Sequence, residues 1–263
     1  MLEVQKHYRF IVSLKTFFID DNYIYALSSY ELAVAPFTNT PVSAHIKCNR
    51  FISMVATDTF LWLVDADSIY RANKDLSDID APTLHMKYTG IAVVSSWNNI
   101  LVVSTHSTIF VGTEEYHVDK KYGIISDIKP YETLYISTEA GIIFSLPHMR
   151  VVADVKKSII KFTKYKDALY ILTLSIDTFY IEKISIGEKK ELAVSEFPLD
   201  VHPYDSVIIV HFKYAVAIFT LDLIPVETIS YDLEIVKVIV SNKRLFIGFA
   251  HGLIEEVIPK LKL

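Results

Sequence analysis

Short runs of apolar and aromatic residues recur along the chain, and polar turn residues separate them. Seven of these runs are rich in β-branched and aromatic side chains, and none is long enough for an amphipathic helix, so each predicts a β-strand. The runs span 22–28, 59–65, 99–105, 133–138, 168–173, 206–211 and 244–249. Their equivalent positions are Ile24, Leu61, Leu101, Leu134, Leu169, Val207 and Leu245, which are 37, 40, 33, 35, 38 and 38 residues apart. A repeat of this length fills the chain.

Each of these strands belongs to a larger repeated unit. A polar turn and a further apolar strand follow it, as at Asp67-Ser68 before 69–72, which is typical of a β-hairpin. Another strand precedes it, as at 124–128, and a more polar strand closes the unit, as at 149–155. Four-stranded units that repeat every 40 residues or so are typical of β-propeller blades. We therefore expect an all-β fold, a seven-bladed β-propeller of four-stranded antiparallel blades, in one domain spanning 1–263.

The two ends of the chain complement one another. The last repeat ends soon after its third strand, 253–257, and the N-terminal run 7–13 has no repeat of its own. We expect this N-terminal strand to lie beside 253–257 as the outer strand of the last blade. Such pairing would close the propeller and remove free sheet edges.

Two segments carry a family resemblance. Residues 124–144, with Pro130 after the inner strand and Gly141 in the turn before the third strand, resemble a WD-repeat blade, and 201–210 resembles its first half. The Gly-His and Trp-Asp dipeptides of that family are absent, so the chain is similar to a divergent member. The resemblance implies a platform for other macromolecules.

Aromatic residues recur at the first turn of four consecutive repeats. Trp97, Tyr131, Tyr165 and Tyr204 stand three or four residues before their anchor positions, so they are expected on one face of the propeller. Tyr and Trp are prominent in protein interfaces because they offer large contact areas at low entropic cost. One interpretation is a partner-binding arc, and the other is that each ring caps the apolar space between adjacent blades.

Charged residues recur on the predicted inner strands. Asp127, Lys161, Asp200 and Lys237 lie seven or eight residues before their anchors, where they are expected to line a central channel. We interpret them as paired charges in a wet channel. The alternative is a metal-dependent hydrolase or lactonase with a site on the axis, although such a site needs more carboxylates than the two present here.

Composition excludes several other classes. Lys and Arg total 26 against 31 Asp and Glu, giving a formal net charge of -5 that disfavours nucleic-acid binding. Mean hydropathy is +0.32, yet polar residues interrupt the longest uncharged stretch, 88–113, so we expect no membrane span. The single cysteine excludes an internal disulfide, and the N-terminus lacks a secretory signal, so we expect a cytoplasmic protein.

Motifs for catalysis are missing from the sequence. The 7 glycines form no phosphate-binding loop. His106, His211 and His251 fall at or beside the second turn of three repeats; we expect exposed or capping side chains rather than a shared zinc site. A single Gln among many Ile, Val, Lys and Glu residues indicates a hyperthermophilic archaeon or a virus of one, with an AT-rich genome as the alternative explanation.

These observations favour a non-enzymatic interaction scaffold without cofactor or metal. We expect its partner to be another protein, and the chain to be a monomer or a subunit of a hetero-complex.

Overall fold

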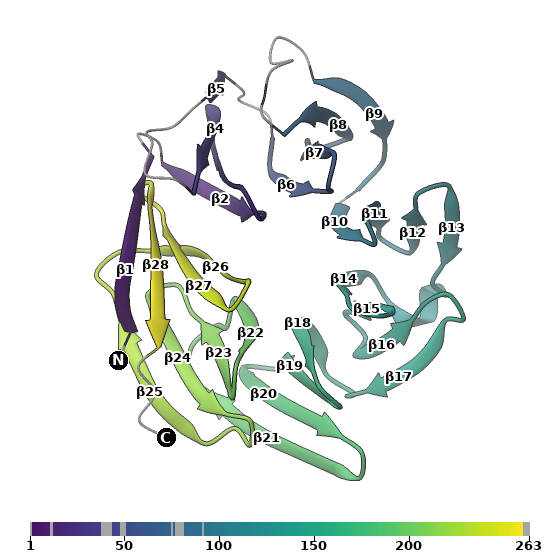
Figure 1. The fold of residues 1–263 in the computed structure, drawn as a ribbon. Helices are drawn as coiled ribbons and strands as arrows, with labels where there is room; N and C mark the ends of the chain where they lie inside the picture. The colour runs from purple at the N-terminus through teal and green to yellow at the C-terminus, as the bar shows by residue number, and fades with distance from the viewer. Residues whose placement is uncertain are drawn as a thin grey trace. The chain divides into compact units, whose positions relative to one another are not determined.

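The structure is a computed structural model that describes residues 2–10, 13–37, 44–47, 51–74, 76, 82–90 and 92–259. The described residues form strands β1 to β28 and one short 3-10 helix, η1 (Lys120–Tyr122). The strands make seven antiparallel sheets of four, so the predicted all-β, seven-bladed β-propeller is confirmed (Figure 1). No helix in the described ranges is long and apolar enough to cross a membrane.

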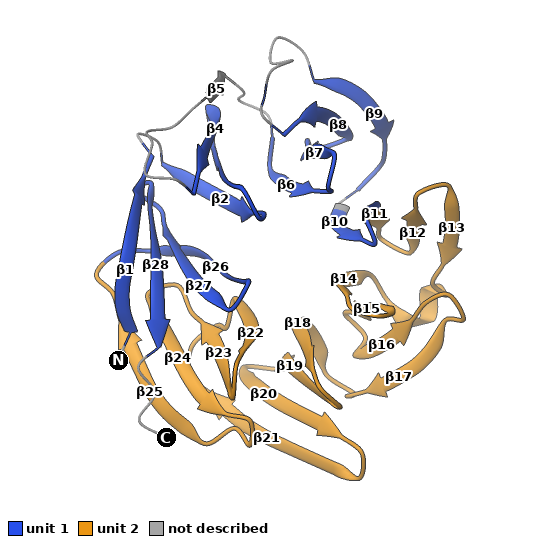
Figure 2. Ribbon diagram, in the orientation of Figure 1, with its two compact units in different colours: residues 1–101, 233–263 blue, residues 102–232 orange. Residues whose placement is uncertain are grey.

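The chain divides into two compact units, coloured separately in Figure 2. Unit 1 comprises 1–101 and 233–263, and unit 2 comprises 102–232. The boundary falls within β11, in the sheet that we number blade 3. Its strands are β10 (Ala92–Trp97), β11 (Ile100–Thr105), β12 (Thr108–Val111) and β13 (Glu114–His117).

Unit 1 holds three complete blades. Blade 1 consists of β2 (Leu14–Ile19), β3 (Tyr23–Ser28), β4 (Glu31–Pro36) and β5 (Ala44–Lys47). Blade 2 consists of β6 (Ser53–Ala56), β7 (Phe60–Val64), β8 (Ser68–Asn73) and β9 (Thr83–Lys87). Blade 7 consists of β26 (Ile235–Ser241), β27 (Arg244–Phe249), β28 (Leu253–Pro259) and β1 (Leu2–Arg9).

Unit 2 also holds three complete blades. Blade 4 consists of β14 (Ile125–Pro130), β15 (Leu134–Thr138), β16 (Ile142–Ser145) and β17 (Arg150–Asp154). Blade 5 consists of β18 (Ser158–Tyr165), β19 (Ala168–Ser175), β20 (Thr178–Ser185) and β21 (Glu188–Val194). Blade 6 consists of β22 (Asp200–Tyr204), β23 (Val207–His211), β24 (Ala215–Thr220) and β25 (Pro225–Ser230).

The apolar runs form strands because both of their faces are buried. In β19, Tyr170 and Leu172 pack in a cluster with Ile208 and Val210 of blade 6. The residues between them point to the other face, where Leu169 and Ile171 pack in a cluster with Phe162 of blade 5 and Ile143 of blade 4. Successive side chains of a strand point to opposite faces, so a strand between two neighbours is apolar at nearly every position. The core of unit 2 therefore lies between its blades.

The N-terminal strand completes blade 7, as predicted. β1 pairs antiparallel with β28, with Tyr8 opposite Ile254 and Arg9 opposite Leu253. The strand covers Leu2–Arg9 rather than the predicted 7–13, so its extent was misplaced, and residues 11 and 12 lie outside the described ranges. The side chains of β1 are mostly exposed, because the strand forms the outer edge of its sheet and buries little apolar surface.

Candidate functional site

The predicted docking residues lie at the turns between the first and second strands of their blades. Tyr131, Tyr165 and Tyr204 occupy these positions in blades 4, 5 and 6 of unit 2, whereas Trp97 ends β10 in unit 1. All four side chains are half-buried. The three tyrosines thus have equivalent places in one unit, and their role in binding a partner stays a prediction.

Two of these tyrosines join neighbouring blades through their hydroxyl groups. Tyr131 Oη lies 2.9 Å from Thr163 Oγ1 and accepts the backbone N–H of Lys164 at 2.6 Å. Both partners belong to β18 of blade 5. The Tyr165 hydroxyl donates to the backbone carbonyl of Asp205 in blade 6. These bonds support the interpretation in which the rings cap the space between blades.

The inner strands of unit 2 hold a network of paired charges. Lys161 Nζ donates to Asp127 Oδ1 at 2.9 Å. Lys129 Nζ lies 3.6 Å from Asp127 Oδ2 and 3.6 Å from Asp200 Oδ1. His202 Nε2 is 3.7 Å from Asp200 Oδ2. The structure therefore brings together three of the four predicted channel-lining residues, Asp127, Lys161 and Asp200, and adds Lys129 and His202.

Two members of this network have pKa values shifted by their neighbours. Burial disfavours the charged form of Asp200, but Lys129 and His202 outweigh burial and hold the pKa of this carboxyl well below its usual range. Burial likewise opposes the charge on Lys129, yet Asp127 and Asp200 raise the pKa of its ammonium group. Lys237, the fourth predicted residue, lies in unit 1, where its Nζ donates to the Phe17 carbonyl at 2.9 Å.

No group of three or more His, Cys, Asp or Glu side chains in the described part of the chain is arranged to hold a metal ion. Both carboxylates on which the hydrolase alternative depends, Asp127 and Asp200, face lysines.

One of the three histidines expected to be exposed or capping is buried. His211 is the last residue of β23, opposite Asp200 of β22, and is only 2% exposed. Its ring stacks on that of His202, with centroids 6.1 Å apart. His106 and His251 are exposed, as expected. β23 extends through His211 because Val216 and Asp200 pair with it on its two sides.

A pocket of about 350 Å³ lies between blades 4 and 5, and we call it the blade 4–5 pocket. Tyr135 and Val152 line it from blade 4, and Leu169 and Ile184 line it from blade 5. Ile186 also lines it, from the turn between β20 and β21, and this side chain is 95% exposed. The pocket is thus an apolar hollow with an aliphatic side chain projecting at its rim.

A β-bulge directs Val152 toward this pocket. Ile143 pairs with Ala153 and Phe144 pairs with Val151, so Val152 is an extra residue in β17 without an opposite partner in β16. Such a bulge re-aims a side chain. Val151 and Val152 are both exposed, which gives this edge strand an apolar surface.

Two charged residues complete the rim of the blade 4–5 pocket. Lys164 Nζ lies 3.5 Å from Glu132 Oε2 and 5.2 Å from the centroid of the Tyr135 ring. The Asp167 side chain is exposed and makes no ion pair with any described residue. The rim therefore presents an unpaired carboxylate beside apolar groups.

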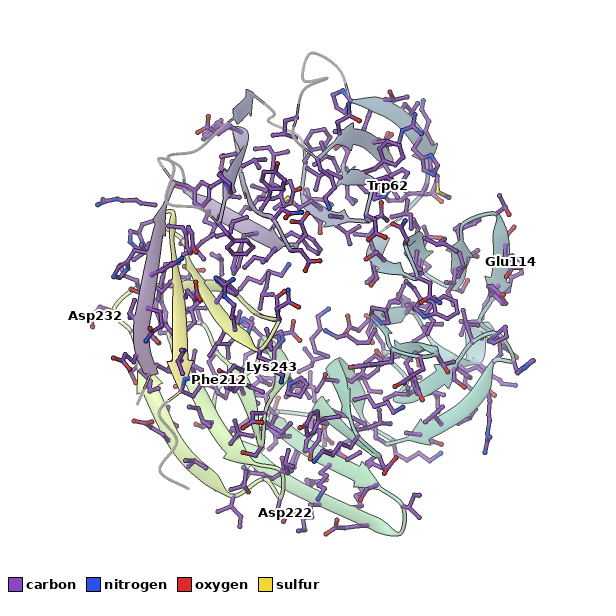
Figure 3. The ribbon with its side chains drawn as sticks, in the orientation of Figure 1. Trp62, Glu114, Phe212, Asp222, Asp232 and Lys243 are labelled. Carbon is purple, nitrogen blue, oxygen red and sulfur yellow. The ribbon has the colours of Figure 1, made fainter. Side chains whose placement is uncertain are left out.

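A second pocket, of about 310 Å³, lies between blades 5 and 6, and we call it the blade 5–6 pocket. Leu192 and Val194 of β21 face Ala215 and Ala217 of β24 across it. Its other lining residues are Ala193, Ser195, Glu196, Phe212, Phe219, Pro225 and Thr228. Phe212, labelled in Figure 3, lines the pocket from just beyond β23.

Neither pocket was predicted from the sequence. For the blade 4–5 pocket, the visible signal was Ile186, an aliphatic residue within an otherwise polar turn, which is 95% exposed. The pockets themselves depend on the spacing between neighbouring sheets, which a repeat pattern does not contain.

Comparisons with solved structures show the fold. The WD40 domain of Pan2 from Neurospora crassa matches with a TM-score of 0.68 at 10% identity, over 96% of this chain and 90% of that one. A catalytically inactive variant of virginiamycin B lyase from Staphylococcus aureus, solved with quinupristin, matches with a TM-score of 0.74 at 11% identity, over 98% and 100%. BBS1N in complex with ARL6DN matches with a TM-score of 0.68 at 9% identity, over 98% and 97%.

No protein-family model and no curated protein matches the sequence. The seven-bladed β-propeller is therefore similar in fold to solved WD40 domains, and the neighbours include both an enzyme and a protein solved in a complex.

Proposed function

We propose that this chain is a non-enzymatic interaction scaffold that binds another protein at the blade 4–5 pocket of unit 2. The observation that carries the proposal is the position of Ile186, which is 95% exposed at the rim of an apolar pocket of about 350 Å³. A single exposed aliphatic residue is ordinary on a protein surface, but one that adjoins an apolar pocket forms a larger patch.

The pocket lies on the face that the sequence predicts for docking. Successive turns of an antiparallel sheet alternate between its two ends, so the β20–β21 turn, with Ile186, lies at the same end of blade 5 as the β18–β19 turn that follows Tyr165. Tyr131 packs edge-on against Tyr135 in the pocket wall, with ring centroids 5.7 Å apart. Tyr131 thus supports the pocket wall from behind rather than contacting a partner directly.

The surroundings of the pocket suit a protein partner. Interfaces combine an apolar centre with a polar rim. Here Val152 and Ile184 supply the apolar centre, and Ile186 stands at the rim beside the charged residues Lys164 and Asp167. The fold also supports such a role, because BBS1N was solved in complex with ARL6DN.

The test compares two isoleucines in turns of the same blade. The tagged chain is expressed in its native host, and co-purified proteins are quantified for the wild type, Ile186→Glu and Ile176→Glu. Burial of an isoleucine side chain contributes about 1.5–3 kcal/mol, so Ile186→Glu should reduce recovery of the partner roughly tenfold or more.

Ile176→Glu is the matched control, because Ile176 is 91% exposed but lies at the other end of blade 5. This variant should retain the partner. Equal recovery with both variants, or no specific partner with the wild type, would show that the proposal is wrong.

A further inference from the structure

Strand β21 is the outer edge of blade 5, and its two halves differ in character. The sheet order places β21 at one end, so one row of its backbone N–H and C=O groups lies outside the ladder formed with β20. Edge strands commonly carry charged residues, especially Lys, which discourage pairing with another chain. In β21 the residues Glu188–Glu191 are all charged, whereas Leu192–Val194 are all apolar. The second half of β21 therefore lacks that protection.

Salt bridges link blades 5 and 6 beside the charged half of β21. Asp222, at the β24–β25 turn and labelled in Figure 3, accepts from Lys183 Nζ at 2.6 Å and from Lys190 Nζ at 3.1 Å. The Tyr170 hydroxyl adds a hydrogen bond of 2.9 Å to the Leu221 carbonyl. The two blades are thus fastened to each other at the start of β21.

The blade 5–6 pocket opens beside the apolar half of the same strand. Ala215 and Ala217 occupy alternate positions of β24, so both point to the same side of their sheet. Their small side chains leave the space of about 310 Å³ between β24 and the Leu192 and Val194 side chains of β21. An apolar side chain carried on a strand added to β21 would enter this space.

The charge at the pocket is negative. Glu196 is the only charged residue among those that line it. Its side chain is exposed and forms no ion pair or hydrogen bond with any residue in the described part of the chain. A positively charged group on a ligand would therefore meet a carboxylate that no described lysine or arginine occupies.

From this arrangement we propose that the blade 5–6 pocket binds a linear peptide in extended conformation, as a fifth strand on the Leu192–Val194 half of β21. The peptide inserts an apolar side chain between β21 and β24 and places a Lys or Arg near Glu196. Strand addition derives affinity from main-chain hydrogen bonds and specificity from pockets for alternate side chains. This site is separate from the blade 4–5 pocket and does not depend on it.

The test selects peptides on the full chain. A phage-displayed library of random eight-residue peptides is panned on the immobilised wild type, with counter-selection on Thr228→Trp. Thr228 is exposed on β25 and lines the pocket, so a tryptophan there fills the space without entering the core. We expect the surviving peptides to share an apolar residue close to a Lys or Arg and to lack proline at their centre.

Synthetic versions of these peptides then separate the contributions by fluorescence anisotropy. Methylation of the central backbone nitrogens removes main-chain donors and should weaken binding at least about tenfold. Glu196→Lys should weaken it roughly threefold to tenfold, with a smaller difference at high salt. Glu139→Lys makes the same charge change in the exposed β15–β16 turn and should leave affinity unchanged.

Several results would overturn the proposal. One is a selection that leaves no peptide after counter-selection, and another is selected peptides that bind wild type and Glu196→Lys equally. Equal binding of methylated and unmethylated peptides would exclude strand addition. Circular dichroism shows whether the Thr228→Trp variant is folded. If that variant is unfolded, Glu196→Lys, a change at an exposed position, replaces it in the counter-selection. The Ile186→Glu variant should bind the peptides normally. Failure of the peptide-binding proposal can therefore be distinguished from failure of the proposal for the blade 4–5 pocket.

Discussion

Tyr131 Oη and Thr163 Oγ1 lie 2.9 Å apart, so a turn of blade 4 is hydrogen-bonded to the first strand of blade 5. The same oxygen accepts the backbone N–H of Lys164. An aromatic side chain that the sequence suggested as a contact for a partner is thus already engaged within unit 2.

This bond predicts the effect of Tyr131→Phe. The change leaves the Lys164 N–H without its acceptor, so the free energy of unfolding should fall by about 1–2 kcal/mol. The melting temperature should fall by roughly 2–8 °C. Thermal unfolding followed by circular dichroism measures the melting temperature.

Tyr204→Phe is the matched control, because no described residue forms a hydrogen bond with the Tyr204 hydroxyl. Its melting temperature should be close to that of the wild type. If Tyr131→Phe instead left the melting temperature unchanged but reduced recovery of a partner, the docking interpretation would be correct.

Glu182 predicts how stability depends on pH. Its side chain is fully buried in blade 5, where it accepts from Thr173 at 2.8 Å and pairs with Lys189 at 2.7 Å and Lys157 at 3.2 Å. Burial alone would raise the pKa of this carboxyl. Lys189, Thr173 and Lys157 lower the pKa by more than burial raises it, so the pKa lies below its usual value of 4.5. The ionised carboxylate therefore stabilises the fold fully at pH values above 4.5. This stabilisation is lost as the pH falls through the lowered pKa of the folded state.

Glu182→Gln should accordingly reduce the free energy of unfolding by roughly 1.5–3 kcal/mol at neutral pH. The difference from wild type should shrink as the pH falls from about 5 to about 3. Urea denaturation at several pH values measures the free energy of unfolding of both proteins. Glu191→Gln removes the more exposed partner of Lys157 and should cost less than about 1 kcal/mol. A difference that stayed constant with pH would contradict this account of Glu182.

Replacement of Ile176 by glycine is expected to stabilise the protein. Its φ of 53° is in the left-handed region, which is unfavourable for a β-branched residue. Ile176→Gly should therefore raise the free energy of unfolding by about 1 kcal/mol and the melting temperature by roughly 2–4 °C.

Ile186→Gly is the control for this substitution, because Ile186 has the same side chain and similar exposure but lacks a positive φ. It should not stabilise the protein. A lower melting temperature for Ile176→Gly would show that the exposed side chain of Ile176 contributes more than its backbone strain costs.

The β1–β28 pairing predicts the effect of removing residues 1–9. The deletion removes a ladder of seven paired residues and the contact between Tyr8 Oη and Glu256 Oε2 at 3.3 Å. We expect a loss of at least about 3 kcal/mol and a melting temperature lower by roughly 6–12 °C. The uncovered edge of β28 should also promote self-association, which light scattering detects.

A synthetic peptide of residues 1–9 should restore both properties when it is added to the truncated chain. Lys6→Ala, an exposed change within β1, should have little effect. Unchanged melting and a monomeric state after truncation would contradict the role given to β1.

The repeat was predictable because strands such as β19 are buried on both faces. Their apolar residues occupy consecutive positions, and polar turns separate them at a regular spacing, so the seven blades and their order could be identified without coordinates. The extent of β1 was less predictable. Its sequence Leu-Glu-Val-Gln-Lys-His is mostly polar because an edge strand buries few side chains, which left the hydrophobic signal at the wrong residues.

The candidate sites were only partly predictable. The pairing of Asp127 with Lys161 follows from their equivalent positions in neighbouring repeats. The direction of the Tyr131 hydroxyl does not, because it depends on where Thr163 lies 32 residues later. The blade 5–6 pocket depends on two alanines of β24, and small residues in a strand do not reveal whether a neighbour fills the space that they leave.

The pairing of Leu2 with Pro259 also sets an order of events during synthesis of the protein. Residues 2–9 leave the ribosome long before their partner strand, which is made only after some 240 further residues. A contact of such long sequence separation forms slowly, and both strand edges are exposed until it does. The charged and polar side chains of β1 suit a segment that must wait in solvent, since they keep it from pairing with other nascent chains.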